Sequence, residues 1–171
     1  MNKTIIIAEA GVNHNGDITL AKKLIDAAAN AGVDFVKFQT FKANKIVSPN
    51  AKMADYQLSN KSEEDESQLK MLKKLELSDT DHQELISYCQ KKNIKFFSTA
   101  FDVDGLSYLS SLGFDIFKIP SGELTNFPYL KAIAQTKKPV ILSTGMANLD
   151  EIGVAITVLI TNGTKKEHLT V

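Results

Sequence analysis

The chain has 171 residues, of which 43% are hydrophobic and 23% are charged, values that are ordinary for a globular domain with a sizeable core. Basic and acidic residues both number 20, so the formal net charge is zero, which argues against a broad surface for nucleic acid or membrane. The single cysteine, Cys89, excludes a disulfide framework within one chain. No apolar run has the length of a signal peptide or a membrane-spanning helix, so we expect a cytoplasmic location.

Short apolar runs alternate with longer amphipathic runs along the chain. The pattern predicts strands at 4–8, 34–38, 95–98, 116–119, 139–143 and 169–171. It predicts helices at 18–31, 79–92, 104–112, 126–136 and 149–161. Glycines follow three of these helices, at positions where a left-handed C-terminal residue is favoured: Gly32, Gly113 and Gly163. Strands that alternate with helices of this length indicate βαβ units and a parallel sheet.

Residues 40–78 interrupt this alternation. The segment is too polar for core strands, is acidic over 62–67, and allows a short helix over 67–75. A long insertion inside a compact βα unit is often a functional loop or a lid. The alternative is a solvated surface excursion, and the sequence leaves both open.

The elements amount to five βα units and the start of a sixth strand. Doubly wound sheets often have five or six strands, whereas a (β/α)8 barrel needs eight strands and about 250 residues. The pattern of elements fits either architecture. No Gly-rich nucleotide-binding fingerprint follows the first strand, which weakens the nucleotide-binding version.

Reactive side chains gather where the predicted strands end. In parallel α/β folds the carboxyl ends of the strands line the active site. Five consecutive predicted strands end in such side chains. In chain order, the groups are Glu9 with residues 13–16, Lys37 with Gln39, Ser98 with Thr99, Lys118 with residues 121–123, and residues 143–145.

Two lysines are the first candidates for a ligand site. Lys37 and Lys118 each lie within an apolar strand, where burying an ammonium group is costly without an anionic partner. Together with the hydroxyl groups of Thr99 and Ser121, they could bind a small dianion. The alternative is a pair of structural lysines, each bridged to a nearby glutamate.

Glu9 and Glu123 are the candidates for general acid–base catalysis. For Glu9 the alternative is a salt bridge to one of the lysines, and for Glu123 a favourable position in the first turn of a helix. Gln39 suits hydrogen bonding to a polyol or an amide, or support of the long insertion.

The histidines carry a weaker signal. His14 lies in an Asn-His-Asn-Gly turn, where it either touches a ligand or stabilises the loop. His82 and His168 are expected at the surface. No group of residues has the spacing of a metal site.

Five segments carry a resemblance to a known family. They are AEAGVNHNG at 8–16, VKFQT at 36–40, FSTAF at 97–101, KIPSGE at 118–123 and LSTGM at 142–146. In order and in spacing they resemble the N-acetylneuraminate (sialic acid) synthase family. The resemblance implies a TIM (β/α)8 barrel, truncated in this chain of residues 1–171 at about the sixth strand. It also implies a C-terminal antifreeze-like domain, absent from the chain, and a domain-swapped homodimer.

The resemblance also implies roles for single residues. Phosphoenolpyruvate-binding positions match Lys37, Thr99, Lys118 and Ser121. The position that contacts N-acetylmannosamine matches Gln39, and the catalytic carboxylates match Glu9 and Glu123. Ala100 departs from the family, which usually has proline there. A divalent metal, manganese or magnesium, is expected to have its ligands on strands absent from this chain.

The implied reaction condenses phosphoenolpyruvate with N-acetylmannosamine to give N-acetylneuraminate and phosphate, with the metal polarising the aldehyde. The alternatives within this class are a legionaminate or pseudaminate synthase, or a more distant phosphoenolpyruvate-condensing aldolase. The alternative from another class is an inactive fragment that only binds ligand or associates with other chains. We expect residues 1–171 alone to be inactive and poorly soluble.

Overall fold

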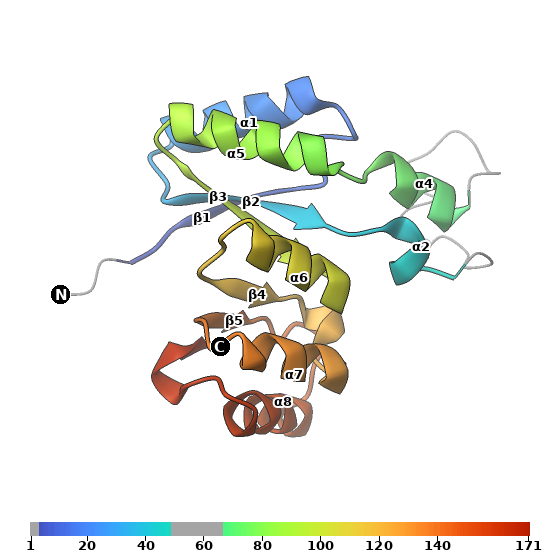
Figure 1. Ribbon diagram of the computed structural model, residues 1–171, viewed down its shortest axis with the longest axis vertical. Coiled ribbons are helices and arrows are strands. Elements are labelled where there is room, and N and C mark those ends of the chain that lie inside the picture. Colours follow the sequence, from blue (N-terminus) through green and yellow to red (C-terminus); the bar gives the residue numbers. More distant parts are fainter. Residues whose placement is uncertain (1–3, 49–66) are drawn as a thin grey trace. The chain divides into compact units, whose positions relative to one another are not determined.

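The computed structural model describes residues 4–48 and 67–171, and strands alternate with helices along the described chain (Figure 1). The chain divides into two compact units, Met1–Phe97 and Ser98–Val171. Each unit is described by itself below, as the first and the second unit.

The first unit is a sheet with helices packed on it. Its elements are β1 (Ile7–Gly11), α1 (Ile18–Asn30), β2 (Phe35–Thr40), α2 (Ala43–Ile46), α4 (Gln68–Lys74), α5 (Asp79–Lys91) and β3 (Lys95–Ala100), which continues past the division. The strand order is β1-β2-β3, and β1 and β2 are parallel. Apolar residues of α1 and α5 pack on β2, with Ile25, Leu85 and Phe38 fully buried.

The first strand begins and ends later than the sequence predicted. The apolar run suggested residues 4–8, but Ile5 and Ile6 are exposed, and the ladder begins where Ile7 pairs with Phe35. The strand then extends to Gly11, where a register shift interrupts the ladder. Gly11 has φ 55°, in the left-handed region that glycine tolerates. Residue 9 therefore lies inside the strand rather than after it.

The second unit repeats the βα pattern. Its elements are α6 (Val103–Ser111), β4 (Phe117–Ile119), η1 (Ser121–Glu123), α7 (Phe127–Gln135), β5 (Val140–Leu142), α8 (Leu149–Thr161), η2 (Lys166–His168) and β6 (Leu169–Thr170). The strands are parallel, in the order β4-β5-β6. The core combines these strands with apolar residues of α6, α7 and α8, among them Leu109, Leu130, Ile133 and Leu159.

Side-chain caps fix where the helices of the second unit begin. Asp102 caps α6, Asn126 caps α7 and Asn148 caps α8, the last in a reciprocal capping box with Glu151. Such caps define the short connections between strand ends and helices, which carry the candidate site residues.

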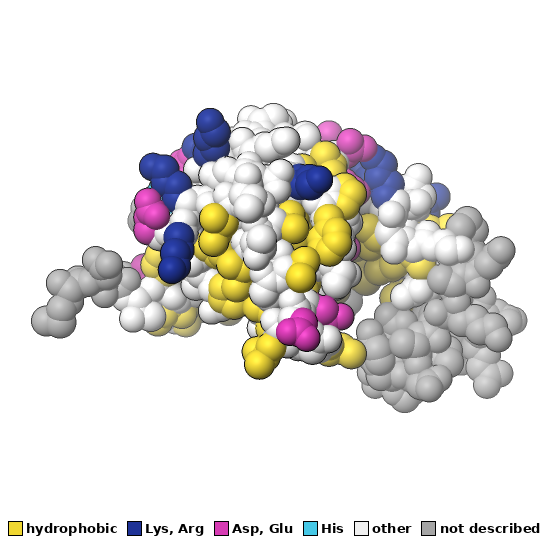
Figure 2. Space-filling view, turned by 90° about the horizontal axis from the view of Figure 1, so that it is seen from below, with side chains coloured by type: hydrophobic (Ala, Val, Ile, Leu, Met, Phe, Trp, Pro, Cys, Tyr) yellow, Lys and Arg dark blue, Asp and Glu magenta, His cyan; other side chains and the backbone are white. Residues whose placement is uncertain are grey.

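Charges of both signs lie on the molecular face seen in Figure 2, among exposed hydrophobic side chains. Two large apolar residues between β5 and the first turn of α8, Met146 and Leu149, are among those exposed. In the described part of the chain, no helix is both long and apolar enough to cross a membrane.

Candidate active site

Polar side chains gather on the face of β1 and β2 that lies opposite the helices. Phe38 of β2 packs into the core, so its neighbours Lys37 and Gln39 lie on the other face. The ladder places Glu9 beside Lys37. A Cβ atom at Gly11 would lie 3.3 Å from Glu9 Oε1 and 3.7 Å from Gln39 Nε2. The absence of a side chain at Gly11 thus leaves space for these groups, and the first unit brings three predicted site residues together.

Lys37 and Glu9 form an ion pair. The Lys37 side chain is only 8% exposed, whereas the Glu9 side chain is 53% exposed. The buried ammonium is therefore neutralised by a carboxylate that still reaches solvent. This is the structural alternative that the sequence left open for both residues. The same pair places a fixed cation beside an accessible carboxylate, so it can hold an anion and exchange a proton at adjacent positions.

The second unit brings the ends of β4 and β5 together. Lys118 is the central residue of β4, and Ser121 begins η1 directly after the strand. A Cβ atom at Gly145, in the loop after β5, would lie 3.6 Å from Ser121 Oγ. The backbone of that loop therefore lies close to the Ser121 hydroxyl group.

Thr99 presents a buried hydroxyl group at the end of β3. Its residue exposure is 1%, and Oγ1 has no hydrogen-bond partner among the residues that the structure describes. Buried hydroxyl groups are normally satisfied, so an unmet one marks a position for a ligand or a water molecule. The next residue is held in place, because the Tyr129 hydroxyl donates to the Ala100 carbonyl oxygen at 2.7 Å. Burial raises the pKa of Tyr129, which keeps this donor protonated.

Glu123 closes η1 and is partly buried. One carboxylate oxygen, Oε2, accepts a hydrogen bond from Asn126 Nδ2 at 2.6 Å. Asn126 was not predicted as a partner of this carboxylate. Its position three residues after Glu123, at the start of a predicted helix, is nevertheless visible in the sequence.

Comparison with known proteins connects these residues to a family. The NeuB family profile matches residues 24–171. The chain belongs to the NeuB family. It is 59% identical over 170 residues to the N,N'-diacetyllegionaminic acid synthase of Campylobacter jejuni, covering 99% of this chain and 51% of that protein. It is 52% identical over 151 residues to the synthase of the same name from Legionella pneumophila, covering 88% of this chain and 42% of that protein.

A solved structure supports the same assignment. The N-acetylneuraminic acid (sialic acid) synthetase of Leptospira borgpetersenii, in complex with citrate, matches with a TM-score of 0.81 and 34% identity. The match covers 95% of this chain and 52% of that one. The NeuB chain thus spans about half the length of the relatives it matches, and its fold class is confirmed as the α/β, TIM-barrel type of those structures.

The residues predicted for the NeuB site are distributed over both units. Glu9, Lys37 and Gln39 lie together in the first unit. The second unit carries Thr99, Lys118, Ser121 and Glu123 at or just after strand ends. Within residues 4–48 and 67–171, no three histidine, cysteine, aspartate or glutamate side chains are grouped as metal ligands. The resemblance places the ligands of the divalent metal on strands outside this chain, so the metal stays a prediction and we assign no step to it.

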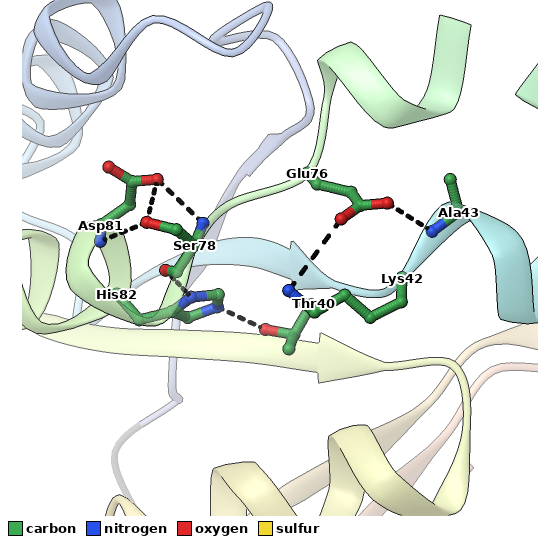
Figure 3. Close-up of polar contacts among 7 residues, drawn as sticks. All are labelled: Thr40, Lys42, Ala43, Glu76, Ser78, Asp81 and His82. Atoms are coloured by element: carbon green, nitrogen blue, oxygen red, sulfur yellow. Dashed lines mark hydrogen bonds and ion pairs between the residues drawn. The ribbon is translucent and has the colours of Figure 1, made fainter. Parts of the chain in front are cut away.

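The two ends of the long insertion are tied together at the end of β2 (Figure 3). Glu76 accepts a hydrogen bond from the backbone N–H of Ala43 at 2.7 Å, and its other oxygen lies 3.9 Å from Lys42 Nζ. His82 bridges Thr40 and the Ser78 carbonyl oxygen. We call these contacts the clasp. Because Gln39 directly precedes Thr40, the clasp also fixes the strand end that carries the predicted sugar contact. Residues 49–66, the middle part of the predicted 40–78 insertion, lie outside the described residues.

The prediction that His82 lies at the surface is wrong. Its residue exposure is 1%, and its Nδ1 lies 2.8 Å from the Ser78 carbonyl oxygen. Nδ1 must therefore carry the proton, and Nε2 accepts from the Thr40 hydroxyl at 2.7 Å. The spacing to Leu85 and Cys89, three and seven residues on, places His82 on the buried stripe of α5 and could have revealed this.

His14 is fully buried as well, and its Nε2 has no hydrogen-bond partner among the residues that the structure describes, so contact with a ligand and support of the turn both stay predictions. Its Nδ1 accepts a hydrogen bond from the backbone N–H of Gly16 at 3.0 Å, and the ring lies against Phe38. The turn itself packs tightly, because a Cβ atom at Gly16 would collide with the carbonyl oxygen of Lys74. The Asn-His-Asn-Gly turn thus packs directly against the end of α4.

We predict that the two buried histidines make the free energy of unfolding depend on pH. Burial is the main cause that lowers the pKa of His14 and of His82, because it disfavours the charged ring. Below about pH 6.5 the unfolded chain binds protons that the folded chain does not, so stability is lost as the pH falls through the unfolded value. We expect the loss between pH 7.5 and 5.5 to be on the order of 1 kcal/mol per histidine.

The measurement is thermal unfolding of a chimaera in which this chain replaces the matching half of the Campylobacter jejuni relative. The doubly substituted His14→Gln, His82→Gln chimaera should have a flatter pH dependence between pH 7.5 and 5.5, although it is less stable throughout. Equal slopes for the two proteins would show that these histidines do not resist protonation in the fold.

Proposed function

We propose that this chain forms the phosphoenolpyruvate-binding part of a synthase that condenses phosphoenolpyruvate with an N-acetylated sugar aldehyde. The products are a nonulosonic acid and phosphate. The observation that carries the proposal is the buried Lys37 ammonium group paired with the accessible Glu9 carboxylate, in a chain of the NeuB family.

The chain's own residues suit the binding of the anionic substrate. We assign Lys37 and Lys118 to the phosphate and carboxylate groups of phosphoenolpyruvate, where their charges orient the substrate and stabilise developing negative charge. The hydroxyl groups of Thr99 and Ser121 donate hydrogen bonds to the same substrate. The unmet Oγ1 of Thr99 supports this assignment, because an oxyanion would satisfy it.

The proposed reaction forms one carbon–carbon bond and breaks one carbon–oxygen bond. C3 of phosphoenolpyruvate attacks the aldehyde carbon, and the aldehyde oxygen takes up a proton. Water adds at C2 and loses a proton, which leaves a hydroxyl group there. The C2–O bond to phosphate then breaks, phosphate leaves, and the hydroxyl group gives up its proton to become the keto group. Glu9 and Glu123 are assigned to these proton transfers. Gln39 is assigned to the sugar, whose acetamido group its side chain can hydrogen-bond.

The comparisons change which sugar we expect as the substrate. N-acetylmannosamine was the substrate expected first, with legionaminate synthesis as an alternative. The identities of 59% and 52% to two N,N'-diacetyllegionaminic acid synthases, against 34% to the sialic acid synthetase, support the alternative. We therefore propose the diacetamido sugar from which N,N'-diacetyllegionaminic acid is made. The domain-swapped homodimer stays a prediction.

The test is to assay the chimaera for phosphate release and sugar-acid formation from phosphoenolpyruvate. The expected result is product formation that depends on both substrates, with the diacetamido sugar preferred over N-acetylmannosamine. The chain alone should give none. A second chimaera, with the other half from the Leptospira synthetase, should retain a preference for the diacetamido sugar if this chain contributes to sugar choice. A folded Campylobacter chimaera that makes no product, beside an active parent enzyme, would contradict the proposed function.

A further inference from the structure

Asn126, at the start of α7, uses both ends of its side-chain amide. Its Oδ1 accepts a hydrogen bond from the backbone N–H of Tyr129 at 3.3 Å, which caps the helix. Its Nδ2 donates to Glu123 Oε2 at 2.6 Å. A single side chain thus joins the helix terminus to one oxygen of the Glu123 carboxylate.

Helix capping alone does not require asparagine. Aspartate caps α1 and α6, and serine caps α4 and α5, because each needs only an acceptor oxygen. Aspartate at position 126 would place a second carboxylate against Glu123, and serine lacks an amide donor. Asparagine can accept from the helix and donate to the carboxylate at the same time.

The first turn of α7 is itself held firmly. Tyr129 is buried, and its hydroxyl donates to the Ala100 carbonyl oxygen, next to Thr99. The turn that carries Asn126 is therefore attached to the end of β3, where another predicted ligand-binding hydroxyl lies. Asn126 holds Glu123 from a rigid support rather than from a mobile loop.

We infer that Asn126 is a positioning residue for the Glu123 carboxylate in the proposed condensation. With Oε2 held by the amide, the orientation of the carboxylate is restrained, and in this assignment Oε1 exchanges a proton with the reacting groups. A proton-transfer group must lie within hydrogen-bond reach of its target, so the orientation of the carboxylate affects the rate. This inference rests on the proposed function, because it requires Glu123 to act in the reaction.

The experiment compares three variants of the chimaera. Asn126→Ser keeps the cap oxygen but loses the donor, and Asn126→Asp keeps the cap but replaces the donor with a like charge. Asn148→Ser is the matched control, because Asn148 caps α8 in the same unit through Glu151. Asn126→Ser and Asn126→Asp should each lower kcat by about 10-fold or more, with the KM values of both substrates nearly unchanged. Asn148→Ser should retain the parent kcat, although both serine variants should lose similar thermal stability.

The outcomes separate this inference from the proposed function. An active chimaera whose Asn126 variants keep the parent kcat would overturn the positioning role and leave the proposed function standing. An equal loss of kcat in Asn148→Ser would also overturn it, because the effect would then be one of stability. An inactive parent chimaera would overturn both. Independently of activity, Glu123→Gln should shift the NMR resonances of the Asn126 side-chain amide but not those of Asn148, and unshifted Asn126 resonances would exclude the contact.

Discussion

Replacing Glu9 or Glu123 by glutamine is expected to lower kcat of the chimaera by about 10²-fold or more. Glutamine keeps the size of the side chain and most of its hydrogen bonding but cannot exchange a proton. For Glu9 the change also removes the charge that neutralises the buried Lys37 ammonium group. The two variants are measured by steady-state kinetics with both substrates varied.

Glu84, a glutamate of the first unit to which no part in the reaction is assigned, serves as the control for these variants. Glu84 forms an ion pair with Lys22 between α5 and α1, and both side chains are partly exposed. Glu84→Gln should leave kcat near the parent value, since exposed ion pairs contribute little. Near-parent turnover of both Glu9→Gln and Glu123→Gln would show that these carboxylates are structural.

Replacing Lys37 by alanine is expected to reduce kcat/KM for phosphoenolpyruvate by about 10²-fold, with a smaller effect on the KM of the sugar. The ammonium group is buried, so an anion that reaches it meets a cation only weakly screened by water. Lys37→Met separates charge from packing, because methionine fills a similar volume. Lys118→Ala should show the same bias towards phosphoenolpyruvate.

The matched control is Lys138→Met. Lys138 pairs with Asp115 at 2.6 Å, but both side chains are exposed, and the contact lowers the pKa of Asp115 without burying either charge. Its loss should not alter the use of phosphoenolpyruvate. If Lys37→Met were as active as the parent, with an unchanged KM for phosphoenolpyruvate, the anion-binding role of Lys37 would be excluded.

The alternation of elements was predictable because it follows directly from hydrophobic periodicity. All five predicted βα units and the start of the sixth strand are present. Strand ends were less predictable. The apolar run at Ile5 and Ile6 suggested an early first strand, but pairing with β2 begins only at Ile7. Strand bounds depend on the partner strand, which the local sequence does not specify.

The candidate site was predictable where a charge stands in an apolar context. Lys37 was identified because an ammonium group in the middle of an apolar strand needs an explanation, and the structure gives it Glu9 as a partner. The roles of His82 and Asn126 were not predicted. The role of His82 depends on contacts between elements that are distant in the sequence, and that of Asn126 on two hydrogen bonds made by one side chain. His82 bonds to Thr40, which lies 42 residues away in the sequence.

The most direct test of the proposed phosphoenolpyruvate site is a crystal structure of the chimaera with phosphoenolpyruvate bound. We predict that the Lys37 and Lys118 side-chain nitrogens both contact the phosphate or carboxylate of the ligand, with Thr99 Oγ1 and Ser121 Oγ donating to the same molecule. Phosphoenolpyruvate bound elsewhere, or the two lysine side chains pointing to opposite ends of the strands, would contradict the central claim.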